Sequence, residues 1–394
     1  MFIKHFVILF FQIHFMKHHS LALCLALIFS FFCFSCSKDS RKKSKETKNK
    51  LTLEIKHSKS FDIQYFNKSK KITIKTPYPK AKEQFEYLLV NKVDSSESLA
   101  QIITPIENIV VTSTTHIPML ELLEVENRLV GFQNTKYVSS ERTRKRIEQG
   151  FVKELGKEFS MNTEVLFELN PDVVVGFSMT KTNKTYNLIE QNGIPVIING
   201  DWLEETPLGR AEWIKFFGAL FDKKKEADSI FNKIESDYLA AIEIAKTSKN
   251  KPSILSGAIM RNDVWSLPGG ESFVAQFLKD ANVEYLWADS EGKGSLNLSF
   301  ESVFDKGQDA DFWIAPGYFS SKEQMLEANK HYADFKAFKN NNIYTPSTKT
   351  GKTGGVIYFE LAPTRPDLVL KDIIKITNPE LLPDYELTFF ERMK

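Results

Sequence analysis

Short runs rich in Val and Ile alternate with helical segments along much of this chain, and this alternation limits the fold more than any other feature of the sequence. In the first half the apolar runs cover residues 109–111, 129–132, 173–175 and 194–198. Several stretches between them carry apolar residues at three- and four-residue steps, as amphipathic helices do. Strands that alternate with helices in this way form a parallel sheet with helices on its faces.

A long segment without strand signals, residues 207–250, separates this half from a second half of the same kind. From Ala227 to Ala245 apolar residues recur at helical steps, which predicts an amphipathic helix on the order of 35 Å long. Strand runs then resume at residues 253–255, 312–314 and 343–344. The sequence therefore predicts an α/β fold in which two Rossmann-like lobes with parallel sheets, residues 106–206 and 251–394, are joined by one long backbone helix.

Residues 51–105 precede the first lobe and show a different pattern. Polar and apolar residues alternate within residues 51–55, 71–75 and 85–90, with turn-forming residues between these runs. Alternation with a period of two is typical of antiparallel strands. We therefore expect a small antiparallel β ribbon ahead of the lobes.

The first 36 residues have the pattern of an export signal. Residues 21–34 are almost entirely apolar, a basic region precedes them at residues 16–19, and the small Ser35 stands before Cys36. This ending resembles a lipobox, so Cys36 is the predicted lipidation site of a lipoprotein signal peptide, and Met16 is the predicted start of translation. A membrane-spanning anchor would need roughly 20 apolar residues, and residues 21–34 alone are too short for this. A retained helix and a soluble cleaved product are the alternatives.

Composition excludes several other classes of protein. All three cysteines, Cys24, Cys33 and Cys36, lie in the predicted signal, so the mature chain has no disulfide framework. Residues 37–50 are polar and basic and are predicted to be a disordered tether. The net charge of +2 gives no reason to expect a nucleic-acid partner. Since Gly-x-Ser-x-Gly, Walker and His-Glu-x-x-His motifs are absent from the sequence, we do not expect an enzyme.

Several short motifs follow one another in order along the predicted lobes. They are Asn162-Thr163-Glu164, Leu169-Asn170-Pro171-Asp172, Gly193-Ile194-Pro195-Val196, Ser299-Phe300-Glu301, Ala337-Phe338-Lys339-Asn340 and Arg365-Pro366-Asp367. Together with the strand and turn of residues 109–116 that precede them, these motifs resemble the helical-backbone class of ABC-importer solute-binding proteins. These are periplasmic binding proteins for cobalamin, haem or ferric siderophores. The resemblance covers residues 106–380.

The resemblance implies a function and a location. The chain is expected to be exported, lipid-anchored to the membrane facing the periplasm, and to bind a small molecule in a largely preformed cleft between its lobes. The ligand would be an iron–siderophore, haem or cobalamin, and the partner an ABC permease dimer with its ATPase. We expect a monomer without a resident cofactor. The alternative is a structural surface lipoprotein that binds no small molecule.

The resemblance also assigns roles to two glutamates. Family members carry an acidic residue on each lobe that pairs with arginines of the permease, and Glu164 and Glu301 occupy the matching positions. Each stands at the start of a predicted helix in its own half. A carboxylate there also interacts favourably with the helix dipole, which is the alternative reason for its presence.

Aromatic faces and a few polar groups are the expected contacts of a large flat ligand. The candidates are Tyr137, Trp265, Tyr358, Phe359 and Arg365. Each aromatic candidate could instead pack in a core, and Arg365 could bind either a ligand anion or a structural carboxylate. Another basic group, Arg142 with Lys145 and Arg146, shares one helical face and is interpreted as solvated.

A transition-metal site is the remaining alternative. His116 follows the first strand, where zinc- and manganese-binding relatives of the resembled family carry a ligand. Such a site needs several His and carboxylate ligands from both lobes. The second half offers His331 as its only histidine, so no metal site is predicted.

Overall fold

The structure is a computed structural model that describes residues 51–394 except 53–54, 96–97, 157–159 and 261–263. The predicted signal peptide, with Met16 and Cys36, and the predicted tether of residues 37–50 lie outside the described residues. Residues 49–394 form one compact unit. Within its described part no helix has the length and apolar character needed to cross a membrane.

The first lobe is built on a parallel sheet with the strand order β10-β9-β6-β7-β8. Its strands are β6 (Ile109–Val111), β7 (Leu129–Phe132), β8 (Lys153–Glu154), β9 (Val173–Gly176) and β10 (Val196–Ile198). Its helices are α2 (His116–Leu122), α3 (Glu141–Glu148), α4 (Thr163–Leu169) and α5 (Lys184–Gln191). The strands β6 and β9 are buried along their whole length, which explains their unbroken apolar sequence.

The second lobe repeats this plan with the strand order β14-β11-β16-β17-β18, parallel except for β18. These strands are β11 (Ser253–Ser256), β14 (Glu284–Tyr285), β16 (Phe312–Ile314), β17 (Ile343–Thr345) and β18 (Glu391–Arg392). A separate antiparallel sheet contains β12 (Ala258–Ile259), β13 (Val264–Pro268) and β15 (Ser295–Ser299). The predicted pair of α/β lobes is thereby confirmed.

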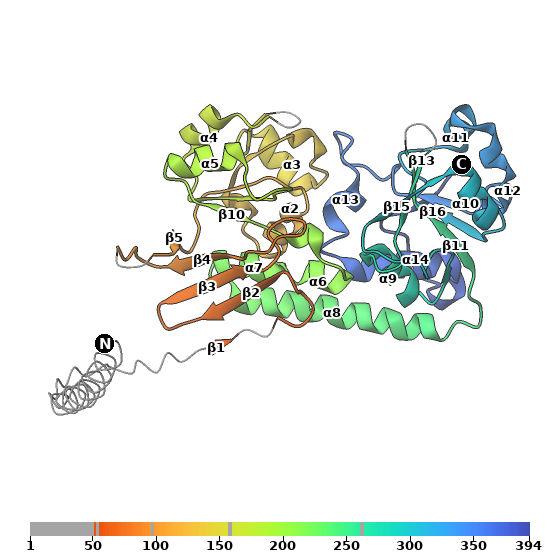
Figure 1. The fold of residues 1–394 in the computed structure, drawn as a ribbon, viewed down its shortest axis with the longest axis horizontal. Helices are drawn as coiled ribbons and strands as arrows, with labels where there is room; N and C mark the ends of the chain where they lie inside the picture. The colour runs from red at the N-terminus through yellow and green to blue at the C-terminus, as the bar shows by residue number, and fades with distance from the viewer. Residues whose placement is uncertain (1–50, 53–54, 96–97, 157–159, 261–263) are drawn as a thin grey trace, which may run out of the picture. The chain divides into compact units, whose positions relative to one another are not determined.

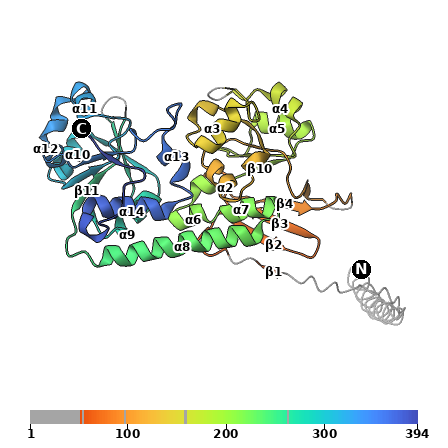
Figure 2. The same cartoon turned by 180° about the vertical axis from the view of Figure 1, so that it is seen from behind.

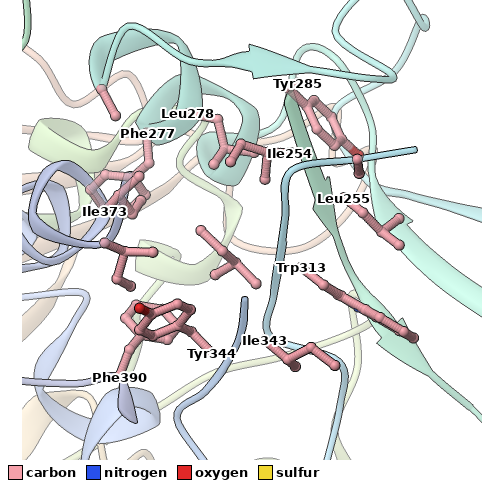
Figure 3. Close-up of a cluster of buried hydrophobic side chains, with 14 of the residues drawn as sticks. Ile254, Leu255, Phe277, Leu278, Tyr285, Trp313, Ile343, Tyr344, Ile373 and Phe390 are labelled. Atoms are coloured by element: carbon pink, nitrogen blue, oxygen red, sulfur yellow. The ribbon is translucent and has the colours of Figure 1, made fainter. Parts of the chain in front are cut away.

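Helices cover the second sheet and form its core with it. They are α9 (Phe273–Asp280), α10 (Phe300–Gly307), α11 (Lys322–Ala328), α12 (Lys336–Lys339), α13 (Ile357–Leu361) and α14 (Pro366–Thr377). Figure 3 shows Trp313 and Ile343 of the sheet in one buried cluster with Phe277 of α9 and Ile373 of α14. These side chains are almost completely removed from water, so their burial is the main stabilisation of this lobe.

The linking region contains α6 (Pro207–Ala211), α7 (Ile214–Leu220) and the long helix α8 (Lys224–Lys246). Helix α8 runs beneath both lobes, as both views show (Figures 1 and 2). It packs against α7 on the side of the first lobe and against α14 on the side of the second. The predicted backbone helix is therefore confirmed. Both lobes therefore pack on one continuous helix.

The N-terminal extension contains β1 (Leu51–Thr52), β2 (Phe61–Tyr65), β3 (Ser69–Ile74), β4 (Phe85–Val90) and β5 (Ala100–Ile103). Strands β1 to β4 pair antiparallel, as predicted, while β5 pairs parallel to β4. The sheet shares a core with the first lobe, since Phe61 packs on Trp213 with ring centroids 4.5 Å apart. The predicted antiparallel strands ahead of the first lobe are therefore confirmed, and their sheet shares its core with that lobe.

Candidate ligand-binding cleft

A cavity of about 520 Å³ lies where the carboxyl ends of strands from both lobes face each other. Thr115 follows β6 of the first lobe, while Ala258, Ala315 and Pro346 follow β11, β16 and β17 of the second. Open parallel sheets bind ligands at this end of their strands. Ala315 has φ of +58°, a left-handed conformation that is costly for alanine and is found mostly where function requires it.

Arg210 of α6 provides the central charge of this cavity. Its Nη2 donates a hydrogen bond to the carbonyl of Trp202 at 2.7 Å, and its guanidinium lies 3.9 Å from the centre of the Phe273 ring. Burial lowers the pKa of Arg210, although the nearby Asp201 opposes this shift. Nevertheless, within the described part of the chain its Nε has no hydrogen-bond partner and no carboxylate lies within 4.0 Å.

The other lining groups are aromatic, aliphatic or hydroxyl-bearing. Among the described residues that line the cavity there is no carboxylate, and the second cation, Lys293, pairs with Glu205 at the surface. The site therefore has a positive character around one partly buried guanidinium. A cation held in such surroundings is costly unless an anion accompanies it.

An aromatic wall closes one side of the cavity. Tyr358 and Phe359 of α13 pack edge to face with centroids 5.7 Å apart, and Phe359 lies 6.4 Å from Tyr318. Half of the Phe359 side chain is exposed, which leaves a ring face available to a ligand. Burial raises the pKa of the Tyr358 phenol to about 12, so at neutral pH it is an uncharged hydroxyl.

Helix α13 also binds the first lobe, although it belongs to the second. The Glu360 carboxylate accepts the backbone N–H groups of Ser139 and Ser140 at 2.7 and 2.9 Å, and only 2% of the residue is exposed. The preceding loop comes so close that a Cβ on Gly351 would lie 2.5 Å from the Ser139 carbonyl. Burial, aided by the Glu121 carboxylate on α2, raises the pKa of Glu360 to about 7.

This raised pKa predicts a pH dependence of stability. The folded protein holds a proton on Glu360 up to about pH 7, whereas the unfolded chain releases it near the ordinary value of 4.5. Because the folded state binds more protons in this window, its unfolding free energy falls by up to about 3 kcal/mol as the pH rises through it. Urea unfolding of the wild type and of Glu360→Gln at about pH 5 and pH 8 measures this difference. The difference in unfolding free energy between the two pH values should be smaller in the variant than in the wild type. Equal differences would contradict the raised pKa of Glu360.

The structure separates the predicted ligand contacts into residues that line the cavity and residues that do not. Tyr358 and Phe359 line the cavity, and their contact with a ligand stays a prediction. Trp265 does not line the cavity, because it is completely buried and stacks on Trp313 at 5.0 Å. Arg365 is held in a bidentate pair with Asp367 at 2.9 and 2.7 Å, so it binds a structural carboxylate. Tyr137 is half exposed and lies outside the cavity lining.

His116 lies in the core of the first lobe and not in the cavity. It is completely buried against Phe217, and burial lowers its pKa, so it is neutral. Its Nε2 lies 3.9 Å from the Asp201 carboxylate. No group of three or more His, Cys, Asp or Glu able to hold a metal occurs among the described residues.

Glu164 and Glu301 are both exposed in the first turns of α4 and α10. Asn162 and Ser299 cap these helices, so each glutamate also lies where the helix dipole favours a negative charge. The geometry is compatible with both interpretations of these residues.

Arg210 is the principal site residue that the sequence did not indicate. It occupies a short helix that begins at Pro207 and is otherwise almost completely buried. A lone arginine in an apolar helical segment was the available signal, but the sequence could not show which side of α6 faces the cavity.

Two α/β lobes on one long helix, with a cavity at the facing ends of their strands, define the class of bilobal solute-binding proteins. The family model described as periplasmic binding protein matches residues 109–349, which is more than half of the chain. The chain therefore belongs to the periplasmic binding protein family.

Individual relatives agree with this assignment. An uncharacterized lipoprotein of Methanocaldococcus jannaschii is 26% identical over 368 residues, 86% of this chain and 85% of that protein. A periplasmic haem-binding protein of Pseudomonas aeruginosa is similar with a TM-score of 0.54 and 15% identity, over 73% of this chain and 98% of that one. A protein of an Fe³⁺-hydroxamate transport system from Saccharomonospora viridis has a TM-score of 0.52 and 16% identity, over 70% of this chain and 94% of that one. At these identities the two structures establish a shared fold.

Proposed function

We propose that this protein is the lipid-anchored solute-binding component of an ABC importer, and that its cleft binds an anionic iron chelate, either a ferric siderophore or haem. The observation that carries the proposal is Arg210, a cation in the cavity without a carboxylate partner among the described residues and next to exposed aromatic faces. A siderophore with acidic groups or a haem propionate would supply the missing anion. Its flat or hydrophobic part would contact Phe359 and Tyr318.

Similar proteins support an iron-containing ligand, whereas the negative charge is inferred from Arg210 alone. One structural relative is named as a haem-binding protein, and another belongs to an Fe³⁺-hydroxamate transport system. Cobalamin remains the alternative ligand, since the resemblance in sequence includes cobalamin carriers. A structural lipoprotein without a ligand is the second alternative, and the cavity argues against it.

Lipid attachment at Cys36 is part of the proposal. The relative from Methanocaldococcus jannaschii is named a lipoprotein, which supports an anchor. Attachment of more than one acyl chain gives durable membrane binding, whereas a single chain binds only marginally. The anchored chain would face the periplasm and deliver its ligand to a permease dimer and its ATPase.

Native mass spectrometry tests the ligand class directly. The soluble chain from Ser37, which lacks the lipidated cysteine, is mixed separately with haemin, ferric enterobactin and cobalamin. We expect a mass shift of one ligand per chain with haemin or ferric enterobactin. A mass shift with cobalamin alone would show that the ligand is cobalamin and not an iron chelate. No shift with any of the three compounds would favour a structural lipoprotein without a ligand.

The permease contact gives a separate prediction. Replacing both Glu164 and Glu301 with alanine should leave ligand affinity unchanged but reduce transport into permease-containing vesicles by at least about tenfold, because charges at an interface steer and register the partner. The matched control replaces Glu168 and Asp305, which are exposed on the same two helices. Transport should survive in this control. If transport also survives in the Glu164 and Glu301 variant, the docking role is wrong.

A further inference from the structure

Residues 56–60 form a strap without regular secondary structure immediately ahead of β2, and the linking region binds its backbone. The Glu212 carboxylate accepts the N–H groups of Lys56, His57 and Ser58 at 2.9, 2.7 and 2.9 Å. Three successive backbone donors on one carboxylate form charge-assisted hydrogen bonds, which are stronger than neutral ones.

A second glutamate continues the same arrangement. Glu204 accepts the N–H groups of Lys59 and Ser60 at 3.2 and 3.1 Å, and it also accepts the Ser58 hydroxyl. Its Oε1, which accepts from Ser58 and Ser60, also accepts the indole N–H of Trp213 at 3.0 Å. The strap thus presents consecutive N–H groups to two carboxylates, and the recognition depends mainly on its backbone.

Both carboxylates are removed from water. Glu212 is 0% exposed and Glu204 is 4% exposed. Apart from the strap, Glu212 accepts a hydrogen bond from the Lys215 ammonium at 2.7 Å, and Glu204 accepts one from the Trp213 indole. Buried carboxylates that lose their donors are costly, so this part of the linking region depends on the strap for its structure.

The strap also contacts the helix that carries Arg210. A Cβ on Gly209 of α6 would lie 3.2 Å from the carbonyl oxygen of His57 and 3.1 Å from Glu204 Oε2, so the strap packs closely against this helix. Arg210 is the next residue, and the negative charge of Glu204 acts on it. One side of α6 therefore contacts the strap while Arg210 lines the cavity.

We infer that the strap is a positioning element of the cleft: through Glu204 and Glu212 it fixes α6 and thereby places the Arg210 guanidinium for an anionic ligand. This inference rests on the proposed function. It gives the N-terminal extension a role in ligand affinity, and it makes Glu204 and Glu212 positioning residues that do not themselves touch the ligand.

Hydrogen exchange of the full mature chain without ligand tests the mechanical part of this inference. In Glu212→Gln and Glu204→Gln the amides of α6 should exchange at least about tenfold faster than in the wild type, because each change weakens charge-assisted hydrogen bonds to the strap. The matched control is Glu235→Gln on α8. Glu235 binds the Lys56 and His57 side chains, but no strap backbone N–H. In the Glu235→Gln variant the amides of α6 should exchange at the wild-type rate.

A double-mutant cycle tests the connection to the ligand, with haemin and ferric enterobactin as probes. Glu212→Gln should weaken binding about tenfold in the wild-type background and cause little further loss in an Arg210→Ala background, since coupled residues are not additive. A merely structural role of the strap would give the same loss in both backgrounds. The stability of every variant is measured alongside, so that unfolded protein is not mistaken for weak binding.

The possible outcomes separate this inference from the proposed function. Unchanged α6 exchange in both glutamate variants, or additive losses of affinity, would overturn the role of the strap. If the wild type binds neither probe, the proposed ligand class is wrong, and the exchange of α6 still decides whether the strap fixes this helix.

Discussion

Replacing Arg210 with alanine should weaken the binding of haemin or ferric enterobactin by roughly 30-fold or more, the effect of removing one partner from a buried charge pair. The guanidinium is fixed by the Trp202 carbonyl and by Phe273, and it lines a cavity whose described lining contains no carboxylate. Arg210→Lys should restore only part of the affinity, because an ammonium lacks the planar fork and stacks less well on an aromatic ring. Equilibrium titration of each variant measures the effect.

Arg142→Ala is the matched control for this experiment. Arg142 is also an arginine of the first lobe, but it pairs with the largely buried Glu126 at 2.6 Å and lies outside the cavity lining. Its removal should leave affinity within about twofold of the wild type, because its guanidinium does not contact the cavity. Equal affinities for Arg210→Ala and Arg142→Ala would remove Arg210 from the binding site.

Replacing Trp265 with alanine should lower the unfolding free energy by about 3–5 kcal/mol, which is the usual cost of deleting a large buried aromatic side chain. Trp265 is 0% exposed and packs on both Trp313 and Phe335, with centroid distances of 5.0 and 5.6 Å, in a cluster in which all three rings contact one another. The cavity left by the indole cannot close, because its neighbours are themselves part of a packed core. Denaturant unfolding followed by circular dichroism measures this loss.

Phe359→Ala provides the contrast, since half of this side chain is exposed in the cleft. We expect a stability change of about 1 kcal/mol or less and a clear loss of ligand affinity. If Trp265→Ala retained wild-type stability, the placement of Trp265 in the core would be contradicted.

The sequence predicted the architecture because periodicity reports directly on which residues are buried. The alternation of apolar runs with helical segments indicated both lobes, and the apolar steps between Ala227 and Ala245 indicated α8. These signals are local, so they need no knowledge of distant contacts. The strands of the extension were predicted for the same reason, but their packing against Trp213 was not, since that contact joins residues far apart in the sequence.

Trp265 was predicted as a ligand contact because periodicity was not applied to its segment, but it lies in the core. In β13 successive side chains point to opposite faces, so Trp265 and Leu267 are buried while Ser266 between them lines the cleft. An aromatic residue near a glycine-rich loop gave no information about this choice of face. The period-two pattern could have given it, had the segment been recognised as a strand.

The sequence could not predict the roles of Arg210, Glu204 and Glu212 for a different reason. Their roles depend on partners far away along the chain, such as Phe273 for Arg210 and the strap for the two glutamates. A charged residue in a helical segment is usually solvated, and only the folded structure shows that these three are buried or partly buried. The same is true of Glu360, whose carboxylate joins the two lobes.

The proposed function requires that the cleft between the lobes bind an anionic iron chelate, which is the central claim. Titration of the mature chain with haemin, ferric enterobactin and cobalamin, followed by tryptophan fluorescence and visible absorbance, tests this claim most directly. We expect saturable binding of haemin or ferric enterobactin with one site per chain, and strong weakening of that binding in Arg210→Ala. Absence of saturable binding, or binding that is unaffected by Arg210→Ala, would contradict the account.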